Sequence, residues 1–87
     1  MTTLAKQTNK ADTWKAYPSS SDFSGIVQNQ CDAPVYLFVS TKGNVPTDAS
    51  GIVLKAGIGE YLPVSISSAE ELYFKPVNAS PVTVRLG

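Results

Sequence analysis

The hydrophobic positions of this 87-residue chain fall into short runs that are separated by turn-forming residues. The most apolar run covers residues 35–40 and reads Val-Tyr-Leu-Phe-Val-Ser, with no polar residue before Ser40. A run of β-branched and aromatic residues between two turns predicts a strand that is covered on both faces. We therefore expect residues 35–40 to form the middle of a sheet.

Other apolar runs predict further strands, at residues 23–29, 51–57, 60–64, 72–77 and 82–86. The last of these alternates most cleanly, so Val82, Val84 and Leu86 are predicted to face inward. A short turn over residues 30–34 separates two of the strands. Segments joined so closely usually form an antiparallel hairpin. Residues 26–29 are therefore predicted to pair with residues 35–40.

One segment, residues 66–72, predicts a single helical turn, with Ser67 as its cap and Glu70 or Glu71 in its first turn. The chain shows no pattern for the crossover helices that a parallel sheet needs. Six or seven short strands with breaks roughly every 8–12 residues are typical of an all-β fold. We predict a small antiparallel β-sandwich, jelly-roll-like, that occupies residues 23–87.

The first 22 residues are predicted to be an extended N-terminal arm. Residues 1–11 are polar apart from Met1, Leu4, Ala5 and Ala11. This segment has too little apolar surface to offset the conformational entropy that it would lose on ordering. Such an arm is either a frayed terminus or a segment that orders on a neighbouring subunit. Trp14 is a large amphipathic anchor of the kind enriched at interfaces, although it also suits the end of a core.

Composition narrows the classes of partner. Seven basic residues balance seven acidic ones without clustering, whereas a nucleic-acid-binding protein normally has a basic face. The apolar runs are far shorter than the ~20 residues that span a bilayer, and the polar start lacks the apolar segment of a secretory leader. We expect no nucleic acid or membrane partner, and synthesis in a cytoplasm, which agrees with the free thiol of Cys31.

Stability and catalysis are both limited by the residues present. With one cysteine and no histidine, the chain has neither an internal disulfide nor a zinc cage, so self-association is the expected support for so small a domain. Hydrolytic triads and common metal sites lack their usual histidine. Most carboxylates lie in or beside predicted turns, typical of solvated residues. We expect no enzyme activity, no catalytic or metal-binding residues and no cofactor.

Several motifs appear in a fixed order: Ile26-Val27-Gln28-Asn29, Val35-Tyr36-Leu37-Phe38-Val39, Gly51-Ile52-Val53-Leu54-Lys55-Ala56-Gly57, Glu60-Tyr61-Leu62, Leu72-Tyr73-Phe74 and Val82-Thr83-Val84-Arg85-Leu86. In this order, residues 25–87 resemble the small β-sandwich structural proteins of tailed bacteriophages, which include capsid decoration, neck and tail components. The resemblance implies a virion protein, made in the host cytoplasm, that decorates or stabilises a capsid or tail lattice. Its partners would be copies of itself and major capsid or tail proteins.

The predicted partner contacts come from two regions. Trp14 and Tyr17 belong to the arm, and Lys42, Asn44 and Asp48 belong to a polar loop over residues 41–50, because such loops often carry contacts. The alternative function is a carbohydrate-binding or host-attachment module that uses surface tyrosines. An aromatic platform of that kind would need the tyrosines on one face of the sandwich.

Overall fold

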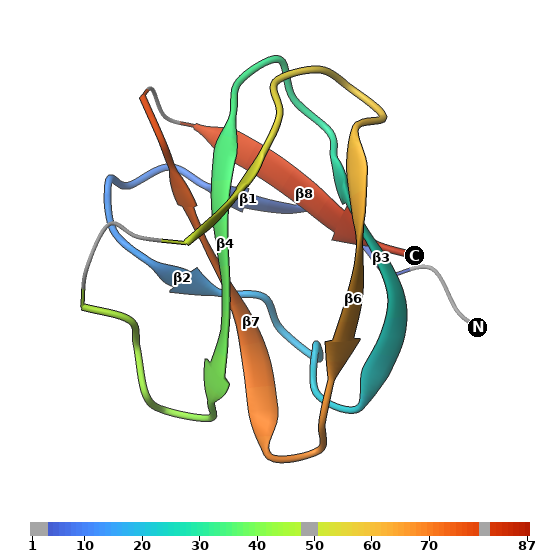
Figure 1. The fold of residues 1–87 in the computed structure, drawn as a ribbon. Helices are drawn as coiled ribbons and strands as arrows, with labels where there is room; N and C mark the ends of the chain where they lie inside the picture. Colours follow the sequence, from blue (N-terminus) through green and yellow to red (C-terminus); the bar gives the residue numbers. More distant parts are fainter. Residues whose placement is uncertain (1–3, 48–50, 79–80) are drawn as a thin grey trace.

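The computed structural model describes residues 4–47, 51–78 and 81–87, and it confirms the small antiparallel β-sandwich. The described residues form β1 (Gln7–Asn9), β2 (Lys15–Ala16), β3 (Phe23–Asn29), β4 (Val35–Thr41), β5 (Ile52–Leu54), β6 (Tyr61–Ile66), β7 (Glu70–Pro76) and β8 (Val82–Leu86). They build two four-stranded sheets (Figure 1). Sheet A has the order β1-β8-β3-β6, and sheet B has the order β2-β7-β4-β5.

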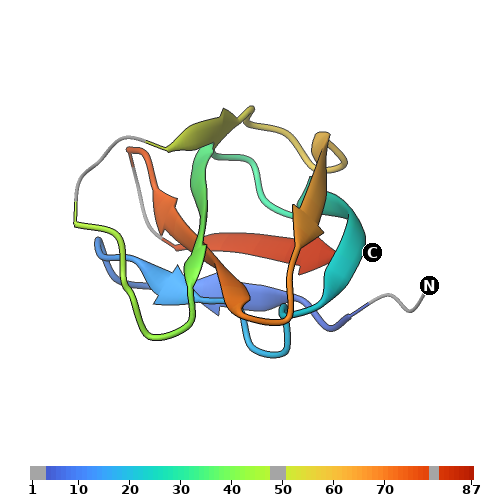
Figure 2. The ribbon, with the colours of Figure 1, turned by 60° about the horizontal axis from the view of Figure 1, so that its bottom comes forward.

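The hydrophobic core lies between the two sheets. In Figure 2, β4 and β7 of sheet B pass in front of β8 of sheet A. Val82, Val84 and Leu86 are fully buried, as their alternation predicted. They meet buried side chains from sheet B, among them Val35, Leu54, Leu72 and Phe74. Burial of one face of each sheet is what stabilises the sandwich, because apolar area removed from water contributes roughly 25 cal/mol per Å².

Strand β4 occupies the predicted position inside a sheet, between β7 and β5. Val35 and Leu37 point into the core, where they are 0% and 4% exposed. Tyr36 and Phe38 alternate with them on the outer face of sheet B, and both rings lie against Trp14. Both faces of the strand are therefore covered, one by the core and the other by an aromatic side chain of the same chain.

The predicted hairpin between β3 and β4 is wrong. Strand β3 pairs with β6 and β8 in sheet A, whereas β4 lies in sheet B. The Asn29 side chain, fully buried, turns the chain out of sheet A: its Nδ2 donates to the carbonyls of Ala33 and Lys55, both at 2.8 Å, and its Oδ1 accepts from the Cys31 N–H at 2.9 Å. The short connection therefore crosses between the layers.

The predicted helical turn at residues 66–72 is also wrong. Its capping pattern exists, since the Ser67 N–H donates to Glu70 Oε1 at 2.9 Å, but it closes only a tight turn between β6 and β7. Leu72, 1% exposed, pairs with Val39 in sheet B. Burying Leu72 in an extended ladder prevails over the local helix signal, because a single helical turn has little stability of its own.

Much of the predicted arm is folded into the sandwich of its own chain. Strand β1 pairs with β8 and β2 pairs with β7, so each becomes the outer strand of a sheet. Polar contacts hold them there: the Thr8 and Thr83 hydroxyls bond at 2.9 Å, and Lys15 Nζ donates to the Thr8 carbonyl at 2.6 Å. The prediction of an unpaired arm considered only the apolar surface that the arm could bury. The arm is held instead because the edge strands of both sheets offer it backbone hydrogen bonds.

Candidate partner-contact groove

An open groove of about 450 Å³ lies on the outer face of sheet B. It is lined by Asp12, Thr13 and Trp14 from the segment between β1 and β2, by Val45, Pro46 and Thr47 from the loop after β4, and by Lys75 of β7. We call it the Trp14 groove. The fold thus brings together the two regions that the sequence predicted separately as contacts, the segment around Trp14 and the loop that begins at residue 41.

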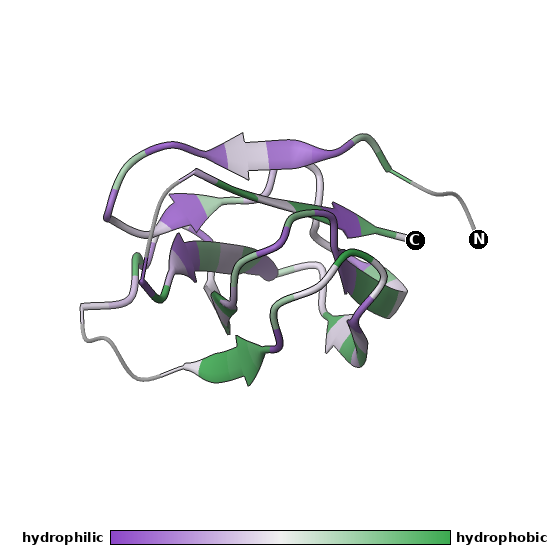
Figure 3. Cartoon of the chain, turned by 90° about the horizontal axis from the view of Figure 1, so that it is seen from above, coloured by the Kyte–Doolittle hydropathy of each residue, from purple (hydrophilic) through white to green (hydrophobic). Residues whose placement is uncertain are grey.

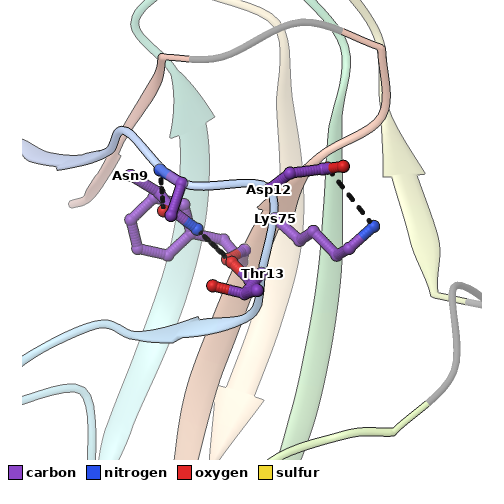
Figure 4. Close-up of polar contacts among 6 residues, drawn as sticks. Asn9, Asp12, Thr13 and Lys75 are labelled. Carbon is purple, nitrogen blue, oxygen red and sulfur yellow. Dashed lines mark hydrogen bonds and ion pairs between the residues drawn. The ribbon is translucent and has the colours of Figure 1, made fainter.

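Asn9 fixes the wall of the groove that carries Trp14. It ends β1, is 2% exposed, and donates from Nδ2 to the carbonyls of Thr13 at 2.6 Å and Phe74 at 3.0 Å (Figure 4). Its Oδ1 accepts from the Ala11 N–H at 3.0 Å. These bonds anchor residues 10–13 to β7, so Trp14 leaves the corner from a defined position.

The half-buried Trp14 ring covers part of the outer face of sheet B. Its centroid lies 6.3 Å from that of Tyr36 and 6.0 Å from that of Phe38, in tilted and edge-on arrangements. Such aromatic pairs are worth about 0.5–1.5 kcal/mol beyond their area burial. Trp14 therefore packs on the outside of the sheet rather than at the end of the core, and it also lines the groove.

The groove carries one positive and one negative group. Lys75 Nζ lies 3.8 Å from Asp12 Oδ1, a contact drawn in Figure 4, and 5.7 Å from the centroid of the Tyr36 ring. The Asp12 side chain is 86% exposed, so water screens this ion pair, and exposed pairs contribute only about 0–1 kcal/mol. The Asp12 carboxylate is therefore open to a partner, whereas the Lys75 side chain is only 18% exposed.

Tyr17, a predicted contact, has no surface for a partner in this fold. It is 0% exposed, its ring centroid is 6.4 Å from that of Phe74, and its hydroxyl donates to the Ala5 carbonyl and accepts from the Leu86 N–H at 3.3 Å. Burial raises the pKa of the Tyr17 hydroxyl. Amphipathic tyrosine suits a core equally well when its hydroxyl finds partners there, which is why the contact prediction for Tyr17 is wrong.

Two of the other predicted contacts belong to the loop after β4, which also carries the groove-lining residues Val45, Pro46 and Thr47. Lys42 and Asn44 are exposed at its start, although neither lines the groove, and Asp48 lies outside the described residues. Sequence reasoning missed Asn9 as a positioning residue. A signal for it exists, because Asn9-Lys10-Ala11-Asp12 is similar to Asn29-Gln30-Cys31-Asp32, and both asparagines anchor a corner.

The four tyrosines do not form a platform. Tyr36 and Tyr73 share the outer face of sheet B, where Tyr73 is only 2% exposed. Tyr61, 59% exposed, belongs to β6 of the other sheet, and Tyr17 is buried. Tyr36, close to Lys75, is therefore the tyrosine nearest to the groove.

Comparison with protein-family models, with curated proteins and with solved structures found no match. Within residues 4–47, 51–78 and 81–87, no group of three or more His, Cys, Asp or Glu residues is placed to hold a metal ion. The same described part of the chain has no helix that is long and apolar enough to cross a membrane. The function is therefore inferred from the groove and from the sequence resemblance.

Proposed function

We propose that this protein is a non-enzymatic structural component of a bacteriophage virion, which decorates or stabilises a capsid or tail lattice through the Trp14 groove. The observation that carries the proposal is the meeting of the Trp14 segment with loop residues 45–47 in one open groove. The virion setting rests on the resemblance of residues 25–87 to small phage sandwich proteins. The proposed partners are major capsid or tail proteins and further copies of the chain.

The proposed mechanism is mechanical. The sandwich supplies a stiff body, and the Asn9 bonds hold one wall of the groove in place before binding. Pre-organisation of this kind favours association, because less conformational freedom is lost at the moment of contact. Each groove is small, but many copies on a repeating lattice make weak contacts effective together.

The virion setting is tested by quantifying this chain, by mass spectrometry, in virions purified from the phage that encodes it. Many copies per particle are expected. A chain that is produced during infection but missing from purified particles would contradict the proposal.

The groove is tested by adding purified protein back to particles that were assembled without it. Val45→Asp and Asp12→Lys each change a residue that lines the groove, and each should weaken binding at least ~10-fold. Asp32→Lys is the matched control, because Asp32 is also exposed and occupies the equivalent position in the other asparagine corner. If both groove variants fold and bind particles like the parent, the groove is not the docking site.

A second candidate, a carbohydrate-binding or host-attachment module, is favoured by one observation. The Trp14 and Tyr36 rings are adjacent beside the polar side chains of Asp12 and Thr13. On a glycan array, this function predicts binding that Trp14→Ala and Tyr36→Ala abolish and that Tyr61→Ala, on the other sheet, leaves intact. An array without signal for the parent protein leaves the structural role as the better candidate.

A further inference from the structure

The four sheet edges in the described fold are not equally protected against pairing with another chain. Strand β1 is polar and is flanked by Lys6 and Lys10, β2 has only two residues, one of them Lys15, and β6 contains Pro63. Lysine, proline and short length are the usual features that discourage edge pairing. Strand β5 is short but reads Ile-Val-Leu, with neither charge nor proline within it.

Hydrophobic side chains are exposed along this edge. Ile52 is 65% and Val53 50% exposed, and the turn and strand beyond them add Ile58 at 74% and Tyr61 at 59%. We call these four residues the β5 edge patch. Figure 3, coloured by hydropathy, shows β5 as an entirely hydrophobic strand at the margin of the molecule. Beside Ile52 lies an open hollow of about 500 Å³, lined by Leu37, Phe38, Val39 and Gly51.

The backbone N–H and C=O of Val53 point away from the rest of sheet B. The Lys42 N–H donates to the Ala69 carbonyl, and the Val77 N–H donates to the Pro34 carbonyl. The backbone N–H and C=O groups of the even-numbered residues of β4 therefore point toward β7. Those of the odd-numbered residues point toward β5, where Leu37 lies opposite Ile52. Because the direction of these backbone groups alternates along a strand, the N–H and C=O of Ile52 and Leu54 point toward β4. The N–H and C=O of Val53 point away from β4, to the open side of the edge.

The geometry points to a second copy of this chain as the occupant of the β5 edge: two β5 strands pair antiparallel across a two-fold axis that passes beside Val53. Each Val53 N–H then donates to the Val53 carbonyl of the other copy. An antiparallel edge contact is self-complementary under two-fold symmetry, so one surface serves both partners. This inference rests on the self-association in the proposed function and is independent of the virion setting.

Area and charge both favour a second copy. The β5 edge patch exposes on the order of 400 Å² of side chain, about half of the ~800 Å² that each partner buries in a standard interface. The flanking backbone and polar residues supply further area, so a weak, concentration-dependent dimer is expected. The chain has no net charge, and Lys55 and Glu60 beside the edge have opposite signs, so two copies do not repel each other.

Sedimentation equilibrium over a range of concentrations tests the dimer. Val53→Lys places two ammonium groups against each other at the axis and should weaken dimerisation at least ~10-fold. Ser24→Lys is the matched control, since Ser24 is exposed on β3 of sheet A, outside both the β5 edge and the groove, and it should dimerise like the parent. A parent that stays monomeric at every concentration, or a folded Val53→Lys variant that dimerises equally well, would overturn the inference.

Disulfide trapping tests the register in a Cys31→Ser background. Val53→Cys should give a covalent dimer on oxidation, because hydrogen-bonded antiparallel residues have Cα atoms ~5.5 Å apart, within disulfide range. Lys55→Cys is the control: two positions from the axis, its Cα atoms would be roughly 14 Å apart. Equal trapping at both positions would reject the Val53-centred pairing.

The two proposals fail separately. Val53→Lys should lose dimerisation and leave the groove intact, while Val45→Asp should lose particle binding and still dimerise. If only dimerisation is lost in its variant, the groove proposal is incorrect. If only particle binding is lost, the β5 pairing is incorrect.

Discussion

Two asparagine corners carry the chain from sheet A to sheet B. Asn9 ends β1 and Asn29 ends β3, and each side-chain oxygen accepts from the N–H two residues later. Each side-chain amide also donates to the carbonyl four residues later. The strands before and after the two corners occupy equivalent places in the two sheets: β1 and β3 flank β8, while β2 and β4 flank β7. The two corners are therefore two copies of the same turn motif.

The two corners lead into different kinds of strand. After Asn29 the chain enters β4, seven residues long and paired on both sides. After Asn9 it passes Trp14 and enters β2, two residues at a sheet edge. The Asn29 corner thus serves the core, and the Asn9 corner supports the groove. A turn motif therefore determines where the chain changes layer, while the residues after it decide whether a buried strand or a surface site results.

The largest expected effect is at the core corner. Asn29→Ala removes hydrogen bonds to Cys31, Ala33 and Lys55 from a fully buried position. Buried polar groups left unpaired cost about 1–3 kcal/mol each, so the free energy of unfolding should fall by about 3 kcal/mol. Urea denaturation measures the change, and a loss below about 1 kcal/mol would contradict the role given to this corner.

Asn9→Ala should have a smaller effect on stability, about 2 kcal/mol, because this corner anchors a three-residue strand at the edge of sheet A. It should also disturb the surroundings of Trp14, the one tryptophan of the chain. The native-state fluorescence of Trp14 should shift to longer wavelength in Asn9→Ala and stay unchanged in Asn29→Ala. Equal spectra for the two variants would refute the distinction between the corners.

Tyr17→Phe removes the hydroxyl that bonds Ala5 and Leu86 and should cost about 1 kcal/mol. The variant also predicts a pH effect. Burial raises the pKa of Tyr17 above its ordinary value of 10.0, so the fold favours the neutral form. This stabilisation is complete below pH 10 and is lost as the pH rises through the raised pKa. Unfolding curves should show that the advantage of the parent over Tyr17→Phe shrinks above pH 10.

The smallest effect is expected at the aspartates of the two corners. Asp12→Asn removes the charge that pairs with Lys75 and should change stability by no more than about 0.5 kcal/mol, less still at high salt. A double-mutant cycle with Lys75→Met isolates the pair, and Asp32→Asn is the control at the other corner. A coupling energy above about 1 kcal/mol would show that the pair is better shielded from water than its exposure indicates.

Parts of the fold could be predicted because they depend on local alternation. Strands β3 and β8 have the predicted limits, and β4 is one residue longer than predicted. The alternation in β8 and the apolar run in β4 are both visible without knowing the partner strand. The pairing of β3 with β4 could not be predicted correctly. A short connection permits both a hairpin and a layer crossing, and the buried Asn29 selects the crossing through contacts that include distant Lys55.

The candidate site divides in the same way. Trp14 and the loop over residues 41–50 were predicted as contact regions from the sequence, because large aromatic anchors and polar loops often carry contacts. Their meeting, together with Lys75 of β7, depends on the pairing of β2 and β4 with the same strand. Tyr17 shows the converse, because its burial results from packing against Phe74 and from hydroxyl partners far along the chain.

The all-β class, most of the strands and the lack of histidine chemistry could be read from the sequence, since they depend on composition and short-range pattern. Three further features emerge only in the folded chain: which strands pair, the closing of both sheets by β1 and β2 of the same chain, and the exposure of β5 as a hydrophobic edge. Pairing and exposure are set by what all segments bury together, and no single segment carries that information.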